Sequence, residues 1–285
     1  MKFKFKEKFM EIIFFISASI SIISLILICV FMFANGIPAI VEIGFFKFLF
    51  GKDWSPTNIP PSFGIFPMIL GSLYVTGGAI LLGVPIGILT AIYLAKFCPE
   101  KLYRCLKPAI NLMAGIPSIV YGFFGLIILV PLTRDIFGGT GNSILTASIL
   151  LATMILPTII SLSEAAIRAV PKDYYEGAVA LGATHERSVI FAMLPAAKSG
   201  IMSSIVLGIG RAIGETMAVV MVAGNQARMP NGILKGIRTL TANIVIEMGY
   251  AADLHRETLI GTGVVLFIFI LIINGIFSVL KRKVV

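Results

Sequence analysis

Residues Gly200–Ala223 decide the fold, and they read GIMSSIVLGIGRAIGETMAVVMVA. The segment has the length and apolar character of a membrane-spanning helix, but Arg211 and Glu215 stand near its middle. A charge at that depth costs from about 3 kcal/mol on insertion scales to over ~10 in simulations, so it normally faces protein or water. The four-residue spacing predicts that both side chains lie on one helix face, about one turn apart. We therefore expect this face to border a polar pathway across the membrane.

The composition of the chain is that of a polytopic membrane protein. Of its 285 residues, 58% are hydrophobic and only 13% are charged, and the mean hydropathy is +0.99. A soluble domain carries about 25% charged residues. The net charge is +9, but the basic residues stand at the ends of apolar runs rather than on a polar face, which argues against nucleic acid as a partner. The expected fold class is all-α, with the lipid membrane as its environment.

Six apolar segments are long enough to cross the hydrocarbon core, which takes about 20 residues. They are approximately Ile12–Phe33, Met68–Leu94, Ile110–Leu132, Ile144–Leu162, Gly200–Ala223 and Leu259–Leu280. The first is too long for the apolar part of a signal peptide and lacks an A-x-A cleavage site, so we expect a spanning helix. Glycine and proline inside the second and third segments predict kinked helices that pack against protein. Gly115-Ile116-Pro117 in the third is expected to serve packing, with a gating kink as the alternative.

Basic residues in the loops predict the orientation of the chain. Six spans place both termini on one side, and that side holds 15 of the 23 Lys and Arg residues against 7 on the other, with Arg211 inside a span. The excess predicts cytoplasmic termini in a multi-pass protein of the cell membrane. The long loops are then Asn35–Pro67 and Asn225–Thr258 outside and Ser163–Ser199 inside. A short interfacial helix is expected at Gly44–Phe50, which is too apolar for free coil.

The sequence carries no signature of a metal site, a cofactor site or an active site. Cys29, Cys98 and Cys105 form no CxxC pair and have no histidine at zinc-ligand spacing, and His185 and His255 are far apart. No acid pair, Ser-Lys pair or histidine cluster converges within the spans, which argues against an intramembrane enzyme. The sequence also lacks the G-x-x-x-x-G-K-[ST] phosphate loop, so any ATP must be hydrolysed by a partner.

The inner loop has the sequence of two short helices joined at a glycine. Pro171–Leu181 has helix chemistry, with proline in the first turn and acids after it, and Gly182 suits the left-handed residue that ends a helix. Thr184 is expected to cap a second helix, with Arg187 three residues later. Pro195 is expected to turn the chain into the fifth span. An ordinary surface loop with an amphipathic helix would look similar, but the spacing here is specific.

That spacing resembles the EAA loop of ABC importer permeases: Glu, Ala or Gly, Ala, three residues, Gly, nine residues, an apolar residue, any residue, Leu-Pro. Its positions are filled by Glu176, Gly177, Ala178, Gly182, Ala192, Leu194 and Pro195. Gly177 replaces the first Ala and Ala192 replaces the usual Ile, and both are small, so the loop is expected to fit slightly differently. Upstream, Glu164-Ala165-Ala166 spells the same letters, but Val170 stands at the glycine position and no Leu-Pro follows at the right distance.

The resemblance implies the type I ABC importer permease fold, called MetI-like, with six transmembrane helices. In that family the loop docks in a groove of a separate ATPase subunit and transmits its closure to the spans. Residues 1–66 would form an N-terminal anchor helix with the first external loop, and residues 67–281 the permease core, with 163–199 as the coupling loop. The chain itself would hold no cofactor, since the partner ATPase binds ATP and Mg.

A further resemblance concerns the transported substrate. Gly208–Val219 is similar to the fifth span of phosphate importer permeases, and Ala114–Gly122, Leu240–Ile244 and Glu247–Tyr250 are similar to the PstC type in particular. The resemblance extends from Phe45 to Leu280. It implies an importer of inorganic phosphate with a second permease of the PstA type, two ATPase subunits of the PstB type and an extracytoplasmic phosphate-binding protein of the PstS type.

Within that family Arg211 and Glu215 are candidate residues of the substrate pathway. The Arg211 guanidinium is always charged, and its planar fork suits phosphate oxygens. Glu215 would hold the arginine in place or keep the site from binding an anion too tightly. The alternative is a structural ion pair that fixes the fifth span to a neighbouring helix without touching substrate.

Two other functions stay open at this point. Another oxyanion importer, of the sulfate or molybdate type, would share the loop and differ in the fifth span. A secondary transporter or channel, which works without an ATPase, would not need the loop Glu176–Pro195.

Among the remaining polar residues, Arg168 is expected to reach lipid headgroups. Asn243 and Glu247 are expected either to line the outer mouth or to be solvated.

Overall fold

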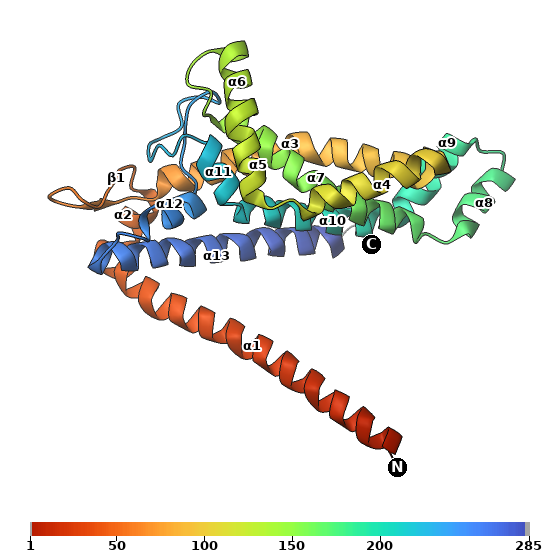
Figure 1. Ribbon diagram of the computed structural model, residues 1–285, viewed down its shortest axis with the longest axis horizontal. Helices are drawn as coiled ribbons and strands as arrows, with labels where there is room; N and C mark the ends of the chain where they lie inside the picture. The colour runs from red at the N-terminus through yellow and green to blue at the C-terminus, as the bar shows by residue number, and fades with distance from the viewer. Residues whose placement is uncertain (1, 283–285) are drawn as a thin grey trace.

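The protein is an elongated helical bundle from which one long helix departs, as the computed structural model in Figure 1 shows. The structure describes residues 2–282; Lys283, one of the basic residues counted for the orientation, lies outside them. The α-helices are α1 (Lys2–Ile43), α2 (Phe45–Phe50), α3 (Phe66–Ile92), α4 (Glu100–Gly115), α5 (Ser118–Phe124), α6 (Val130–Phe137), α7 (Ile144–Arg168), α8 (Lys172–Ala180), α9 (His185–Ser188), α10 (Leu194–Gly214), α11 (Met217–Val222), α12 (Leu240–Glu247) and α13 (Asp253–Arg282).

The remaining regular elements are short. Three π-helical turns, η1 (Tyr93–Phe97), η2 (Gly125–Leu129) and η3 (Val189–Met193), continue or join helices. Strands β1 (Trp54–Ser55) and β2 (Ser62–Phe63) form an antiparallel hairpin in which Trp54 lies opposite Phe63. The all-α prediction is therefore confirmed, with this hairpin as a small addition.

Six helical stretches of the described chain are long and apolar enough to cross a membrane, which confirms the predicted number. They are Glu7–Ile43, Phe66–Phe97, Ser118–Phe137, Ile144–Arg168, His185–Gly214 and Asp253–Ile276. The third begins at Ser118 rather than Ile110, because Ile116 and Pro117 are extended and interrupt the helix. Proline disfavours helical geometry at the residue before it. The segment before the break, α4, is a separate amphipathic helix.

The centre of the bundle is α7, which packs against α3 on one side and α10 on another. Glycines allow the close approach to α3: a Cβ added to Gly83 would lie 2.9 Å from Ile155 Cδ1, and one added to Gly87 would lie 2.8 Å from Ile159 Cγ2. Small residues at helix crossings let membrane helices gain van der Waals contact that lipid cannot supply. This close crossing fixes the scaffold against which the fifth span is held.

The first helix, α1, contacts the bundle only near its C-terminal end. There it crosses α13 closely, since a Cβ added to Gly36 would lie 3.0 Å from Gly261 Cα. Towards its N-terminus the helix diverges from the bundle, and apolar side chains such as Phe15 (73% exposed) and Leu27 (63%) surround it. A helix that is apolar on all sides belongs in lipid or between other helices, as the prediction of a spanning helix requires.

The two ends of the bundle carry different structures (Figure 1). One end, here called the α8 end, holds α8 and α9. The opposite end, here called the hairpin end, holds the β hairpin, α2 and α12. α2 confirms the short helix expected at Gly44–Phe50. α1 starts and α13 finishes toward the α8 end, as an even number of spans requires.

Candidate functional site

The fifth span is broken at Glu215. α10 ends at Gly214, Glu215 is extended (φ −68°, ψ 132°), and a new short helix, α11, begins at Met217. The prediction of one uninterrupted helix through Arg211 and Glu215 is therefore wrong, and so is the shared helix face. Glycine is a weak helix former, so Gly214 favours an end at this point.

Glu215 caps the helix that follows the break. Its Oε1 accepts the main-chain N–H of Thr216 at 3.1 Å and of Ala218 at 3.2 Å. Carboxylates are favourable at helix N-termini because they satisfy unpaired N–H groups and complement the helix dipole. The side chain thus stabilises the start of α11.

Arg211 lies on the last full turn of α10 and reaches towards α7. Its Nη1 donates to Thr158 Oγ1 at 3.4 Å, and the side chain is half-buried. Among residues 2–282, no carboxylate oxygen lies within salt-bridge distance of Arg211, so the predicted pairing with Glu215 is absent from this conformation. A guanidinium offers five N–H donors, and a neutral threonine satisfies only one of them. The proposed contact between Arg211 and substrate stays a prediction.

The broken third span packs on the broken fifth span. A Cβ added to Gly122 of α5 would lie 2.9 Å from Ala218 Cα of α11, which leaves room for no side chain. Tyr121 donates its hydroxyl hydrogen to the Met113 carbonyl at 2.9 Å, across the extended Ile116 and Pro117. Irregular backbone at membrane depth is tolerated where it is buried in protein or lines a water-filled cavity. The two breaks therefore identify one region as the candidate pathway.

At the α8 end the two predicted short helices joined at a glycine are present, and α8, α9 and the turn between them are here called the knob. α8 covers Lys172–Ala180, Gly182 follows with a φ of +86°, and Thr184 Oγ1 accepts the Arg187 N–H at 3.4 Å. The turn expected at Pro195 is wrong, because a continuous helical path runs from His185 to Gly214. Pro195 lies in the first turn of α10, directly after the π-turn η3, where a missing N–H is tolerated. The knob is therefore the end of the fifth span itself.

The residues of the loop signature divide between the knob and the bundle. Glu176, Gly177 and Gly182 are exposed and Ala178 is half-buried. Leu194 instead packs into a cluster that includes Ala91, Ile167 and Met193. Leu181 is 92% exposed, which leaves an apolar side chain at the tip of the knob. The first half of the signature, Glu176 to Gly182, therefore faces solvent, whereas Leu194 in the second half packs against the bundle.

Sequence reasoning missed the role of His185, which anchors the knob. Its Nδ1 lies 2.9 Å from the Tyr175 hydroxyl and its Nε2 lies 3.2 Å from the Lys96 carbonyl. The ring also packs edge-on against Phe97, with 4.9 Å between ring centres. Because Lys96 and Phe97 belong to η1, these contacts connect α8 and α9 to the end of the second span.

A buried carboxylate near the α8 end was also missed. Glu164 is 2% exposed and accepts from Lys107 Nζ at 2.6 Å, Arg168 Nε at 2.7 Å and the Tyr103 hydroxyl at 2.8 Å. The hydrogen bond to this carboxylate raises the pKa of the Tyr103 hydroxyl above its ordinary value. Arg168 also donates to the Leu94 carbonyl at 2.8 Å. Two Arg168 nitrogens, Nε and Nη2, are therefore bound to protein, and the headgroup role expected for this partly exposed side chain stays a prediction.

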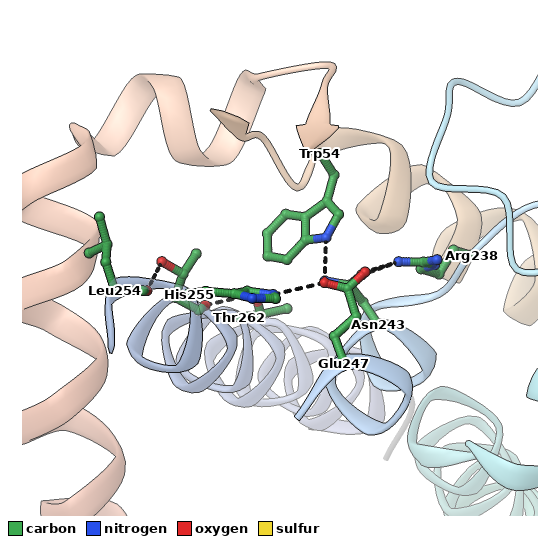
Figure 2. Close-up of polar contacts among 8 residues, drawn as sticks. Trp54, Arg238, Asn243, Glu247, Leu254, His255 and Thr262 are labelled. Carbon is green, nitrogen blue, oxygen red and sulfur yellow. Dashed lines mark hydrogen bonds and ion pairs between the residues drawn. The ribbon is translucent and has the colours of Figure 1, made fainter. Parts of the chain in front are cut away.

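At the hairpin end, Glu247 and Asn243 are buried rather than solvated or lining a mouth. Glu247 is 4% exposed and accepts from Trp54 Nε1 at 2.9 Å, from His255 Nε2 at 2.8 Å and from Arg238 (Figure 2). Arg238 also donates to Asn243 Oδ1 at 2.9 Å. Both expectations for these residues are wrong because their partners, distant in sequence, enclose them. This group of five is here called the Glu247 cluster.

In the described part of the chain, no three His, Cys, Asp or Glu side chains converge in a way that could hold a metal ion. The polar groups instead form the two buried clusters and the pathway candidates already described.

Comparison with known proteins agrees with this geometry. The chain is 39% identical over 276 residues to a probable ABC transporter permease protein of Bacillus subtilis, YqgH, with 94% of this chain and 89% of that protein covered. It is 34% identical to the phosphate transport system permease protein PstC of Mesorhizobium japonicum, with coverage of 87% and 82%. The predicted resemblance to phosphate permeases is confirmed.

Solved structures support the fold. A chain of the MetNI methionine ABC transporter matches with a TM-score of 0.63 and 23% identity, covering 78% of this chain and 96% of that one. A chain of a bacterial alginate ABC transporter, solved with a periplasmic protein, matches with a TM-score of 0.65 and 15% identity, covering 95% of each. The MetI-like prediction is confirmed. The sequence model of the family described as "binding-protein-dependent transport system inner membrane component" matches residues 83–285, and the chain belongs to that family.

Proposed function

We propose that this chain is the permease subunit of an ATP-driven importer that carries inorganic phosphate across the cell membrane. The single observation that carries the proposal is the identity of 34% to a PstC phosphate permease over most of both chains. The broken spans and the exposed knob are the structural features that such a subunit needs. The chain supplies the conduit, and its family is a membrane component of a transport system rather than an enzyme.

The knob is the proposed contact with the ATPase. α8 has no buried residue, and the knob exposes Tyr174, Val179 and Leu181, whose apolar side chains suit a groove on a partner. Because α9 continues through η3 into α10, a force on the knob is transmitted along the fifth span to the break at Glu215. We expect the partner ATPase to bind ATP and Mg, with Glu176, Gly182 and their neighbours in its groove.

The remaining partners and the orientation belong to the same proposal. A PstA-type permease would complete the pathway, two PstB-type subunits would supply ATP hydrolysis, and a PstS-type protein would deliver phosphate. The α8 end would lie in the cytoplasm and the hairpin end outside, in keeping with the excess of basic residues. Residues 1–66 would act as an anchor and 67–281 as the core.

Arg211 is the proposed phosphate contact. Its only described hydrogen bond goes to a neutral hydroxyl, so its charge is available to an anion passing the break. Glu215 would act on the same path by fixing the start of α11 rather than by holding Arg211.

The substrate is tested by uptake of radiolabelled phosphate in cells that lack their own importer and express the complete set of partners. We expect saturable uptake that a tenfold excess of sulfate or molybdate does not reduce. Uptake that sulfate or molybdate inhibits as strongly as unlabelled phosphate does would assign the chain to another oxyanion importer. Uptake that persists without the ATPase subunits would assign it to the secondary transporters.

A further inference from the structure

The hairpin end contains a series of contacts that leads from an exposed tip to the break in the fifth span. The hairpin tip is open to solvent, with Ile59 fully exposed, whereas Trp54 at the hairpin base is 7% exposed. Trp54 packs edge-on against Phe63, with 6.0 Å between ring centres, and donates to Glu247 (Figure 2). The hairpin base is therefore connected to Glu247 through buried contacts.

Glu247 connects three separate parts of the chain. Its carboxylate, at the end of α12, receives hydrogen bonds from Trp54 of the hairpin, His255 of α13 and Arg238 of the preceding loop. A buried carboxylate that loses a donor pays the desolvation cost of an unsatisfied charge. The position of α12 is thus set by the hairpin and not only by its own packing.

The opposite end of α12 contacts the break. Thr239 caps the helix by accepting the Ala242 N–H at 3.2 Å, and Thr241 Oγ1 donates to the Glu215 carbonyl at 3.0 Å. The Glu215 carbonyl follows the end of α10, where main-chain groups lack helical partners. Thr241 therefore holds the residue whose side chain caps α11.

We infer that Glu247 and Thr241 are positioning residues of the transport pathway, which couple the hairpin to the fifth-span break. Trp54 binds the Glu247 side chain at the C-terminal end of α12. Thr241, in the first turn of the same eight-residue helix, binds the Glu215 main chain, so the helix links the two contacts. The inference rests on the proposed function only in taking this break as part of the pathway. A partner protein that moved the hairpin tip would thereby alter the cap of α11.

Amide hydrogen exchange of the purified full chain in nanodiscs tests this inference without any need for phosphate. Trp54→Phe keeps an aromatic ring but removes the indole N–H together with the five-membered ring that carries it, and Thr241→Val keeps the shape and removes the hydroxyl. We expect either change to speed exchange of residues 215–223 about five-fold, the effect of losing one ordinary hydrogen bond on local opening. Ser62→Ala is the matched control, because the Ser62 hydroxyl bonds only to Asp53 within the hairpin.

The double variant decides whether the two residues act through one series of contacts. Combined Trp54→Phe and Thr241→Val should speed exchange no more than the larger single effect, since both interrupt the same connection. Thr241→Ser should restore the wild-type exchange. Unchanged exchange at 215–223 in Trp54→Phe, an effect in Ser62→Ala of the same size, independent effects in the double variant, or an equal rise at 172–188 would each overturn the inference. Phosphate uptake by the wild type tests the proposed function separately.

Discussion

Arg211 and Glu215 are four residues apart, yet they make contacts with different parts of the protein. Arg211 donates to Thr158 of α7, whereas Glu215 accepts the Thr216 and Ala218 N–H groups at the start of α11. The sequence suggested that Arg211 and Glu215 act as a pair, in which Glu215 holds the arginine. The helix break between them gives each side chain its own partners instead. Arg211 has a neutral hydroxyl as its described partner, and Glu215 fixes the start of α11.

Removal of the Glu215 carboxylate should loosen α11. Glu215→Ala eliminates the capping acceptor, which is expected to cost about 1 kcal/mol of local stability and to lower the initial rate of phosphate uptake. Glu215→Gln retains an oxygen in the same place, so its loss should be clearly smaller. Uptake rates of the two variants at matched expression check this order. Equal losses would show that the charge matters and the cap does not.

Arg211→Lys should reduce phosphate uptake about 10-fold, because lysine keeps the charge but lacks the planar fork that binds two oxygens at once. The control is Thr158→Val, which removes the neutral partner of Arg211 and leaves the guanidinium in place. We expect less than a two-fold change in that control, because the 3.4 Å hydrogen bond to Thr158 is long and weak and the guanidinium stays available to phosphate. Full-rate uptake by Arg211→Lys would contradict a bidentate contact with phosphate.

The knob should lose the ATPase when Gly182 is replaced by proline. Gly182 has a φ of +86° and donates its N–H to the Val179 carbonyl at 2.8 Å, and proline can provide neither feature. Co-purification of the ATPase subunit with the tagged permease measures the loss. Gly177→Ala is the control, since a Cβ there would meet no atom within 4 Å and alanine favours the helix. Retention of the ATPase by Gly182→Pro would exclude the knob as its docking element.

Glu164→Gln should destabilise the α8 end. The change leaves Lys107 and Arg168 without their carboxylate, and we expect a loss of about 2 kcal/mol, less than for a fully buried pair because the Arg168 side chain is 45% exposed. Thermal unfolding in detergent measures it. Glu100→Gln removes an ion pair of two exposed side chains, Glu100 and Arg104, and should leave the unfolding temperature unchanged. If both variants unfold at the same temperature, the Glu164 contacts do not stabilise the fold.

The knob could be predicted from the sequence because its determinants are local. The helix that begins after Pro171, the left-handed Gly182 and the Thr184 cap each depend on neighbouring residues. The number of spans followed from apolar length for the same reason. Both results rest on chemistry that a few consecutive residues specify.

The break at Glu215 could not be predicted from apolar length, because a broken helix and a continuous one contain the same residues. The available signal was Gly214 followed by Glu215 and Thr216, which is an end-and-cap pattern inside a span. The buried clusters around Glu164 and Glu247 could not be predicted from the sequence for another reason. Trp54 and Glu247 are 193 positions apart, and Tyr103 and Glu164 are 61 apart, so only the folded chain brings them together.

The most direct test of the account is phosphate uptake into proteoliposomes that contain the purified complex of this chain, its partner permease and the ATPase subunits. Phosphate-loaded binding protein is supplied at the hairpin end, and ATP is supplied or withheld at the α8 end. The account predicts saturable uptake that requires ATP and is lost in Gly182→Pro. Uptake at the same rate without ATP, or none in the presence of every partner, would contradict it.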